Sequence, residues 1–262
     1  MSKTLRAAAI QFNISLGYID SNLDKAIAAL RRVAGQGVKL AVLPEMWSCG
    51  YDYRNMAELA KETPRVLEAI QDECRKLNLV CVGSLPELEN ETIYNTAYLI
   101  DNGELVDSYR KLHLFSTMRE DKFLGPGNKA LVAETSIGRL GIAICYDLRF
   151  PELFRKLALE GAEIICIPAE WPKPRQEHWK TLLRARAIEN QVFVVAANCC
   201  GVQGKLDFFG LSQLISPLGN ILKIAEEADT ELVADFDFGE METYRAQIDI
   251  LADRRADIYG TP

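Results

Sequence analysis

The sequence predicts an α/β fold in which two similar layers of sheet and helix face each other. In both halves of the 262-residue chain, short apolar runs alternate with segments whose apolar residues recur at helical spacing, which is typical of a mainly parallel sheet. Each half then ends in a turn signal between two short strands, so antiparallel strands are expected to join each sheet. No linker rich in Pro, Ser or Gly separates the halves, and residues 1–262 are therefore expected to form one domain.

The first half contains the strands and helices of the first expected layer. Its strands are expected at residues 5–12, 38–43, 79–85, 92–100 and 104–109. Asp20 or Ser21 offers an N-cap for the first helix, and Thr63 followed by Pro64 marks the start of the second. The last two strands flank Asp-Asn-Gly at residues 101–103, which is a hairpin signal.

A polar, glycine-rich loop is expected over residues 116–130, and the alternation returns after it. The expected strands cover residues 139–144, 163–168, 192–197, 209–216, 222–224 and 231–236, and the expected helices cover residues 151–159, 177–189 and 238–246. A second turn signal lies at residues 217–220. The charged tail, residues 249–262, is expected to be extended.

The composition is that of an ordinary globular protein, with 48% hydrophobic and 26% charged residues and a net charge of −7. No basic stripe is present, so neither nucleic acid nor a membrane is an expected partner. No apolar stretch approaches the ~18 residues of a membrane helix, and the start of the chain lacks the apolar run of a signal peptide. Seven cysteines without regular spacing indicate reduced thiols, so a cytoplasmic location is expected.

Three distant segments each place one reactive side chain at the end of an apolar run. They are VKLAVLPEMWSCGY with Glu45, SYRKLHLF with Lys111, and GRLGIAICYDLRFPEL with Cys145. Side chains at the carboxyl ends of strands face the ligand-binding edge of an α/β sheet. A carboxylate, an ammonium and a thiol together are the groups needed to break an amide bond through a thioester.

Each of these residues also has an ordinary interpretation when it is considered alone. Cys145 is compatible with an inert core thiol, and Glu45 and Lys111 with solvated side chains. In the catalytic interpretation, partial burial raises the pKa of Glu45 toward neutrality. The positive charge of Lys111 beside the thiol then favours the Cys145 thiolate.

Taken together, the segments resemble the nitrilase superfamily of carbon–nitrogen hydrolases. The signatures occur in the family's order, LPEMW, YRKLHLF and CYDLRFPE, and the likeness continues through HWKTLLRARAIENQVFVVAANCCG to the SPLGN turn. The resemblance implies a four-layer α-β-β-α sandwich with two mixed sheets. It also implies a homodimer, with residues 249–262 at its interface, and no metal or organic cofactor.

The resemblance assigns a role to each reactive residue. Glu45 is expected to serve as base, acid and base again, and Cys145 as the nucleophile. Lys111 and the backbone N–H of Tyr146 are expected to stabilise the oxyanion. A second family glutamate falls at Glu120, nine residues after Lys111. The competing Glu134 lies beyond the GPGN turn.

The substrate is a small molecule in this interpretation, and the sequence says less about it. Trp171 is expected to wall an acyl chain, and Lys173 or Arg175 to meet a substrate carboxylate. Tyr51 is assigned with them to oxyanion or substrate binding, whereas His113 is expected to make a structural hydrogen bond.

The segments CYDLRFPE and AEWPKPR are most similar to the omega-amidase branch, whose members hydrolyse the terminal amide of dicarboxylate monoamides. The same chemistry leaves an N-carbamoyl amide hydrolase, a deaminated-glutathione amidase and a nitrilase as alternatives. A non-catalytic binding or scaffold protein on this fold is the alternative from another class.

Overall fold

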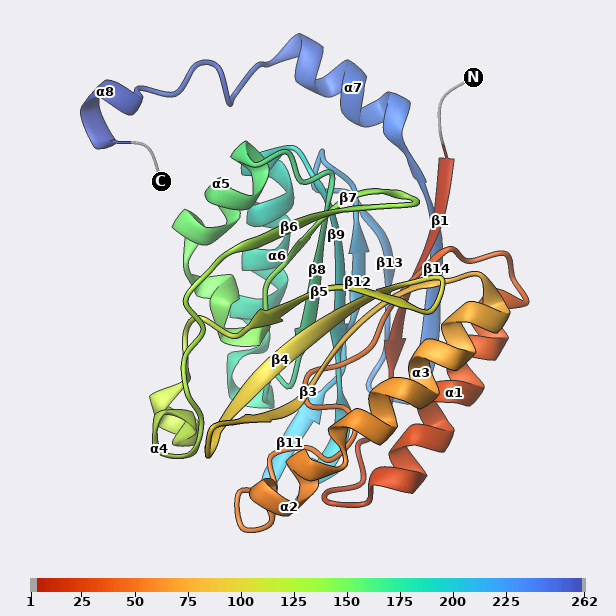
Figure 1. Cartoon of the computed structure of the whole chain (residues 1–262). Helices are drawn as coiled ribbons and strands as arrows, with labels where there is room; N and C mark the ends of the chain where they lie inside the picture. Colours follow the sequence, from red (N-terminus) through yellow and green to blue (C-terminus); the bar gives the residue numbers. More distant parts are fainter. Residues whose placement is uncertain (1–3, 261–262) are drawn as a thin grey trace.

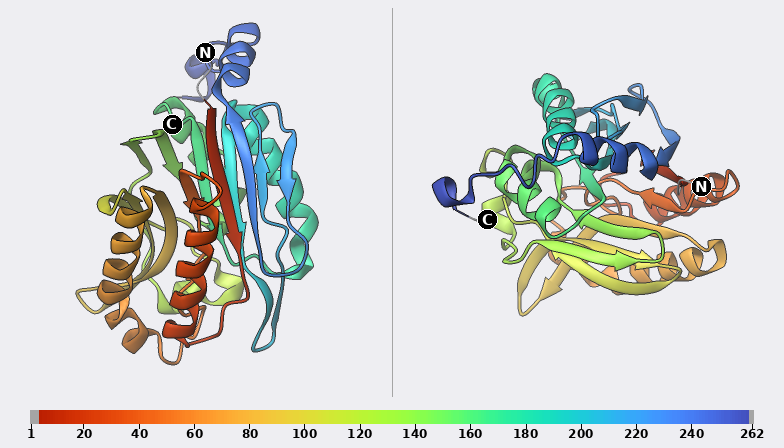
Figure 2. Two further views of the ribbon diagram at one scale, coloured as in Figure 1. Left: turned by 90° about the vertical axis from the view of Figure 1, so that its right-hand side faces the viewer. Right: turned by 90° about the horizontal axis from the view of Figure 1, so that it is seen from above.

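The computed structural model describes residues 4–260, which form two six-stranded sheets packed face to face, with helices outside (Figure 1). A second view shows the sheets nearly edge-on between the helices (Figure 2). The predicted α/β sandwich of four layers, with two mixed sheets, is therefore confirmed.

The first sheet has the strand order β14-β1-β2-β3-β4-β5. Its strands are β1 (Thr4–Gln11), β2 (Leu40–Val42), β3 (Val80–Glu89), β4 (Thr92–Asp101), β5 (Glu104–Arg110) and β14 (Thr230–Asp237). β1, β2 and β3 run parallel, whereas β4, β5 and β14 are added by antiparallel pairing. Helices α1 (Ile19–Ala34) and α3 (Thr63–Leu77) cover its outer face, and the short α2 (Met56–Lys61) precedes α3 (Figure 1).

The second sheet has the strand order β13-β12-β9-β8-β7-β6. Its strands are β6 (Leu131–Thr135), β7 (Gly138–Ile142), β8 (Ile164–Ala169), β9 (Phe193–Asn198), β12 (Gln213–Ile215) and β13 (Ile221–Ile224). Helices α5 (Pro151–Leu159) and α6 (Gln176–Asn190) lie on its outer face (Figure 1). A separate two-stranded ribbon pairs β10 (Cys200–Gln203) with β11 (Leu206–Phe209).

The alternation of side chains along a strand explains how the first sheet fills two cores. In β1, Ala7 and Ala9 belong to the core between the sheets, while Ala8 and Ile10 belong to the core under α1 and α3. The two sheets are also joined by aromatic stacking, with ring centroids of Phe193 and Phe236 4.3 Å apart. Because such strands are packed on both faces, the residues that directly follow them are held in fixed positions.

The predicted N-caps do not form, although the predicted start of the second helix at Thr63 and Pro64 is confirmed. α1 begins at Ile19, so Asp20 and Ser21 lie inside its first turn, and no side chain caps it. α3 begins at Thr63 without a side-chain cap, because the Thr63 hydroxyl instead donates to the Pro86 carbonyl oxygen at 2.5 Å.

Two predicted segments also differ from the structure. The expected loop at residues 116–130 contains the 3₁₀ turn η1 (Ser116–Met118) and the short helix α4 (Glu120–Phe123), and β6 follows it. The expected strand at residues 209–216 is interrupted between β11 and β12. Gly210 and Leu211 there have φ of 68° and 52°, which is not a strand conformation.

The C-terminal segment leaves the sandwich after β14. Helix α7 (Phe238–Gln247) and the short α8 (Ala256–Tyr259) lie beyond the ends of the strands (Figure 1). The expectation of an extended tail is therefore wrong for α8. Among residues 4–260, no helix is both long enough and apolar enough to cross a membrane.

Candidate active site

The residues singled out from the sequence lie just beyond the ends of strands, in both sheets. Glu45 follows β2, Lys111 follows β5 directly, and Cys145 follows β7 at the start of the 3₁₀ turn η2 (Cys145–Arg149). The structure brings these segments together, since the strands of an α/β sheet deliver their carboxyl ends to a common edge.

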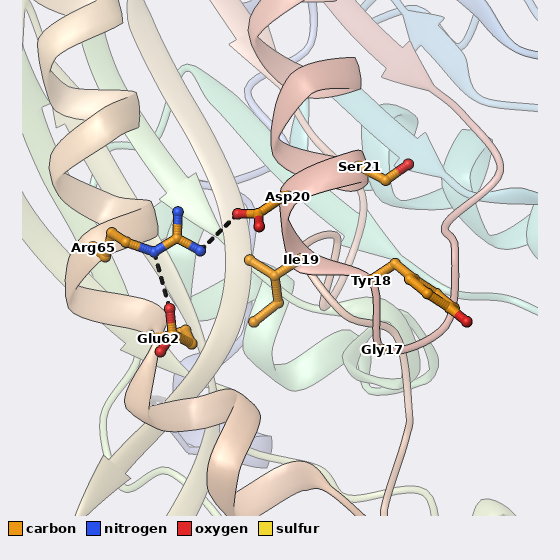
Figure 3. A pocket seen from close by; sticks show the side chains of 7 residues that line it. All are labelled: Gly17, Tyr18, Ile19, Asp20, Ser21, Glu62 and Arg65. Atoms are coloured by element: carbon orange, nitrogen blue, oxygen red, sulfur yellow. Dashed lines mark hydrogen bonds and ion pairs between the residues drawn. The ribbon is translucent and has the colours of Figure 1, made fainter.

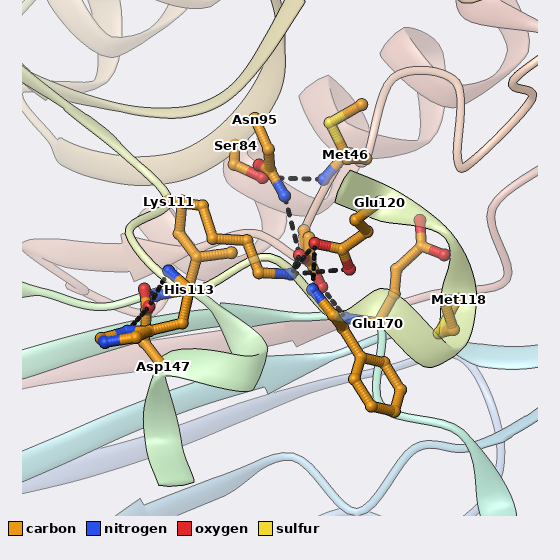
Figure 4. Close-up of polar contacts among 12 residues, drawn as sticks. Met46, Ser84, Asn95, Lys111, His113, Met118, Glu120, Asp147 and Glu170 are labelled. Carbon is orange, nitrogen blue, oxygen red and sulfur yellow. Dashed lines mark hydrogen bonds and ion pairs between the residues drawn. The ribbon is translucent and has the colours of Figure 1, made fainter. Parts of the chain in front are cut away.

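Lys111 is the centre of a buried cluster of charges. Its ammonium Nζ lies 2.7 Å from Glu45 Oε1 and 2.9 Å from Glu120 Oε1. All three side chains are at most 2% exposed. Lys111 and Glu120 reach the same point from different elements (Figure 4). The short helix α4 supplies Glu120, and the N–H of Phe115 donates to Glu120 Oε2 at 3.1 Å.

Neutral donors complete the environment of the Glu45 carboxylate. The Tyr51 hydroxyl donates to Oε1 at 2.6 Å, and Asn95 Nδ2 of β4 donates to the same oxygen at 2.7 Å. The N–H of Glu170, directly after β8, donates to Oε2 at 2.7 Å. The Cys145 thiol lies near enough to help lower the pKa of this carboxyl. Every contact favours the ionised form of this buried group.

The cluster sets opposite pKa directions for its two glutamates. Burial raises the pKa of Glu45, but the charge of Lys111 and the hydrogen bonds from Lys111 and Tyr51 outweigh burial and hold it below its usual value. Burial, together with the charge of Glu45, raises the pKa of Glu120 despite Lys111. The expectation that burial brings the Glu45 pKa toward neutrality is therefore wrong.

The ammonium and the thiol each keep their proton in this environment. Burial alone lowers the pKa of Lys111, but the charges of Glu120 and Glu45 reverse that effect and raise it well above its usual value. Burial and the charge of Glu45 raise the pKa of Cys145 well above its usual value, more than Lys111 lowers it. The expectation of a resting thiolate is therefore wrong, because burial and the charge of Glu45 together outweigh the charge of Lys111.

Cys145 stands in a strained turn between strand and helix. Its φ of 46° lies in the left-handed region that a side chain disfavours. Asp147 holds this turn: its Oδ2 accepts from the Ile144 N–H at 2.9 Å and from the Tyr109 hydroxyl at 2.7 Å. Its Oδ1 accepts from the His113 N–H at 3.0 Å and lies 2.7 Å from His113 Nδ1. His113 and Asp147 form a pair of their own, apart from the Lys111 cluster (Figure 4).

A small, narrow pocket opens beside the Cys145 thiol. It is lined by Phe115, Cys145, Tyr146, Arg149, Glu170, Trp171, Pro172 and Arg175. Aromatic rings form much of its wall, with Phe115 stacked on Tyr146 at 4.6 Å between centroids. Of the two cations considered from the sequence, only Arg175 lines this pocket. Lys173 Nζ instead pairs with Glu227 at 3.0 Å and Asp207 at 3.4 Å.

The sequence did not single out Asn95, Asp147, Arg149 or Glu170 as members of this site. Two of them carried a usable signal. Asp147 lies three residues after Ile144, the spacing of an N-terminal capping pattern. Glu170 is an acidic residue that directly follows the apolar run IICIPA. The competing Glu134 is exposed on β6 and lies 3.6 Å from Arg139.

A second depression lies at the start of α1 and α3 (Figure 3). Arg65 is the one arginine or lysine that lines this depression, and its guanidinium already donates to Asp20 at 2.8 Å and to Glu62 at 2.9 Å. We assign no site there. Within residues 4–260, no group of three or more His, Cys, Asp or Glu side chains is arranged to hold a metal ion.

Comparison with known proteins identifies the family. The carbon–nitrogen hydrolase family profile matches residues 6–246. The chain is 38% identical over 255 residues to a 2-oxoglutaramate amidase of Bacillus subtilis, covering 96% of this chain and 98% of that protein. It is 31% identical over 272 residues to the chloroplastic omega-amidase of Arabidopsis thaliana, covering 95% and 74%.

Solved structures agree with these relatives. Saccharomyces cerevisiae Nit3, a member of branch 10 of the nitrilase superfamily, superposes with a TM-score of 0.90 at 29% identity, covering 97% of this chain and 98% of that one. An amidase from Nesterenkonia with acrylamide added to its active-site cysteine superposes with a TM-score of 0.88 at 30% identity, covering 97% and 98%. This chain belongs to the carbon–nitrogen hydrolase family.

Replacing Asp147 with asparagine tests its hold on the cysteine turn. The amide directs an NH₂ group toward donors, so buried hydrogen bonds to a carboxylate worth about 1.5–3 kcal/mol each are lost. We expect a lower midpoint of urea unfolding and a kcat about 10²-fold lower, because a displaced turn misplaces the nucleophile. Asp121→Asn, at an exposed residue of α4, is the control. Unchanged kcat and midpoint in Asp147→Asn would contradict the assignment.

Proposed function

We propose that this protein is a cysteine-dependent amidase that hydrolyses small linear amides to a carboxylate and ammonia. The observation that carries the proposal is the fully buried ion pair of Glu45 with Lys111, whose charges both act on the buried Cys145 thiol. Relatives named amidases and an amidase structure modified at its active-site cysteine support it. Nucleophile, base and oxyanion donor all belong to one buried cluster.

The first half of the reaction moves one proton through Glu45. The carboxylate takes the Cys145 proton as the sulfur attacks the amide carbon. Lys111 donates to Glu45 at 2.7 Å and to Glu120 at 2.9 Å, and its third hydrogen bond, to the Tyr51 hydroxyl, is long at 3.4 Å; that N–H would turn to the developing oxyanion. The Tyr146 N–H is the second oxyanion donor. When the C–N bond breaks, Glu45 returns its proton to the nitrogen and ammonia leaves.

The second half hydrolyses the thioester. Glu45, ionised again, removes a proton from water as the water oxygen attacks the thioester carbon. The C–S bond then breaks, Glu45 gives the proton to the sulfur, and the acid leaves. The low pKa of Glu45 and the high pKa of Cys145 mean that thiolate forms only as substrate is attacked. Glu120 positions Lys111 rather than transferring a proton.

We expect Cys145→Ala to abolish release of ammonia while the fold persists. The test is a panel of dicarboxylate monoamides, neutral aliphatic amides, N-carbamoyl amino acids and nitriles, with ammonia as the readout and circular dichroism as the control of folding. Succinamate and 2-oxoglutaramate are the expected substrates. Turnover by Cys145→Ala at the wild-type rate would refute the thioester route, and turnover of other classes alone would refute the monoamide assignment.

The pocket favours a substrate that carries a carboxylate. Arg149 Cζ lies 4.7 Å from the Trp171 ring centroid, and Arg175 Cζ lies 5.0 Å from that of Phe115. Burial, followed by the nearby charge of Arg175, lowers the pKa of Arg149. Within the described part of the chain, neither arginine forms an ion pair with a carboxylate. A bound carboxylate would neutralise them and accept paired N–H groups.

Arg175→Gln should therefore raise KM for a dicarboxylate monoamide by about 10–100-fold, the loss expected for one hydrogen bond to a charged group. The KM for a neutral aliphatic amide should change by less than about threefold. Lys173→Gln is the matched control, because that lysine is exposed and already paired. Equal effects of Arg175→Gln on both substrates would show that the arginine does not recognise the carboxylate.

We propose further that the chain forms a homodimer through its C-terminal segment. α7 is fastened to α6, since Arg245 Nη2 donates to the Gln191 carbonyl oxygen at 2.9 Å and Gln191 Nε2 donates to that of Ile248 at 2.8 Å. Beyond this point Ile248 and Ile258 are 51% and 70% exposed. Burying these two side chains against a second chain would remove apolar surface from water.

Sedimentation should give the mass of two chains for the wild type. The double variant Ile248→Asp/Ile258→Asp should shift toward one chain, because a charge replaces apolar contact at both positions. Ile221→Asp on β13, 42% exposed in the single chain, is the control. A monomeric wild type, or a dimer unaffected by the double variant, would contradict the proposed interface.

A further inference from the structure

The short helix α4 carries Glu120 to Lys111, but its own sequence gives it little stability. It has four residues, far fewer than an isolated helix needs. Arg119, directly before it, has a φ of 63°, in the left-handed region that a side chain disfavours. The Glu120 carboxylate nevertheless lies 2.9 Å from Lys111 Nζ. Contacts from outside the segment must therefore hold α4 in place.

The chain that follows α4 is fastened to β4 and to the backbone of Lys111. The Gly127 N–H donates to the Lys111 carbonyl oxygen at 2.8 Å, and the Gly125 N–H donates to that of Ile93 at 2.8 Å. A Cβ atom on Gly127 would clash with the Arg110 carbonyl oxygen, so this close approach requires glycine. These contacts fix the chain beyond the helix, and the turn with the glutamate needs a support of its own.

Tyr53 supplies that support on both sides of Glu120. Its hydroxyl donates to the Met118 carbonyl oxygen at 3.0 Å, two residues before the glutamate. Its ring stacks on that of Phe123, three residues after the glutamate, with centroids 4.4 Å apart and planes at 15°. Met118 and Glu120 lie on the same short segment beside Lys111 (Figure 4). One side chain therefore spans the turn that carries the carboxylate.

The Tyr53 ring is itself held in place. It packs against a buried apolar cluster that consists of Met46, Cys49, Tyr51, Met56 and Leu124. Its centroid lies 5.5 Å from that of Tyr51, whose hydroxyl oxygen is 3.2 Å from Glu120 Oε1. Burial, followed by the charge of Glu120, raises the pKa of the Tyr53 phenol, so its hydroxyl keeps the proton that it donates. The support of α4 is thus continuous with the residues around the buried carboxylates.

We propose that Tyr53 is a positioning residue: it fixes α4 so that the Glu120 carboxylate stays on Lys111 and the ammonium is aimed at the oxyanion. The proposal rests on the proposed amidase function. If α4 moves away, Glu45 alone directs the ammonium, and the aim is lost. Tyr53 does not line the Cys145 pocket. We therefore expect kcat to respond more than KM, because the oxyanion exists only during the reaction.

The test compares Tyr53→Phe with Tyr53→Leu in the full-length protein. Phenylalanine keeps the stacked ring and loses only the hydrogen bond, so kcat should fall by about fivefold. Leucine loses both contacts, so kcat should fall by about 30–100-fold. KM should stay within about threefold of the wild type in both variants. Tyr18→Leu, at a tyrosine that is 70% exposed, is the control and should leave kcat and KM unchanged.

A double-mutant cycle with Glu120→Gln separates positioning from a general loosening of the fold. Because Tyr53 acts through the Glu120 carboxylate, Tyr53→Leu should lower kcat by less than about threefold in the Glu120→Gln background. A merely structural tyrosine would give the same loss in both backgrounds. Phe123→Leu removes the stacked ring from the exposed side of the contact and should lower kcat by about tenfold. It tests the same contact if Tyr53→Leu does not fold.

A second readout does not depend on turnover. The Leu124 N–H donates to the Glu120 carbonyl oxygen at 2.8 Å, so its hydrogen exchange reports whether α4 is formed. Tyr53→Leu should speed exchange in residues 116–124 by about tenfold or more, while exchange in α6 stays at the wild-type rate. If no amide is hydrolysed, this measurement still decides whether Tyr53 fastens α4.

Three results would overturn the proposal. Wild-type kcat in a folded Tyr53→Leu variant would remove the positioning role. Equal losses of kcat with and without the Glu120 carboxylate would show that Tyr53 does not act through that residue. Unchanged exchange in residues 116–124 of Tyr53→Leu would show that α4 does not depend on the tyrosine.

Discussion

The dehydrated pairing of one ammonium with two carboxylates is the constraint around which this molecule is organised. Lys111, Glu45 and Glu120 are all withdrawn from water, and removing one member of such a buried pair typically costs about 3–5 kcal/mol. Tyr51, Asn95 and backbone N–H groups supply the remaining hydrogen bonds. These donors come from separate strands and turns, so the cluster forms only when the sheets are correctly packed.

This pairing also explains how a thiol of high pKa is compatible with nucleophilic chemistry. The carboxylate beside Cys145 opposes a resting thiolate, but it is also the group that accepts the thiol proton. The strained turn of Cys145, held by Asp147, keeps the sulfur against that base. Proton transfer is thereby tied to the arrival of a substrate carbonyl, and a stable buried anion is avoided.

The charges of the site are divided between its two ends. Cys145 lies near the acidic cluster around Lys111 and also lines a pocket with Arg149 and Arg175, neither of which pairs with a carboxylate among residues 4–260. The chain as a whole is acidic, with a net charge of −7, so these unpaired cations are a local feature of the pocket. Such an arrangement orients a molecule that has an amide at one end and a carboxylate at the other.

Local sequence determined the strands, most helices and the three segments that carry Glu45, Lys111 and Cys145, because apolar periodicity and strand-end position are properties of neighbouring residues. It missed α4, although it named Glu120, because a four-residue helix has too few turns to show a period. Only the tertiary structure decided which groups meet. Glu170 and Glu45, 125 residues apart, are joined by strand packing that no local pattern records. The same packing sets the neighbouring charges and the burial: Lys111 and hydrogen bonds outweigh burial and lower the pKa of Glu45, whereas burial and the charge of Glu45 raise the pKa of Cys145.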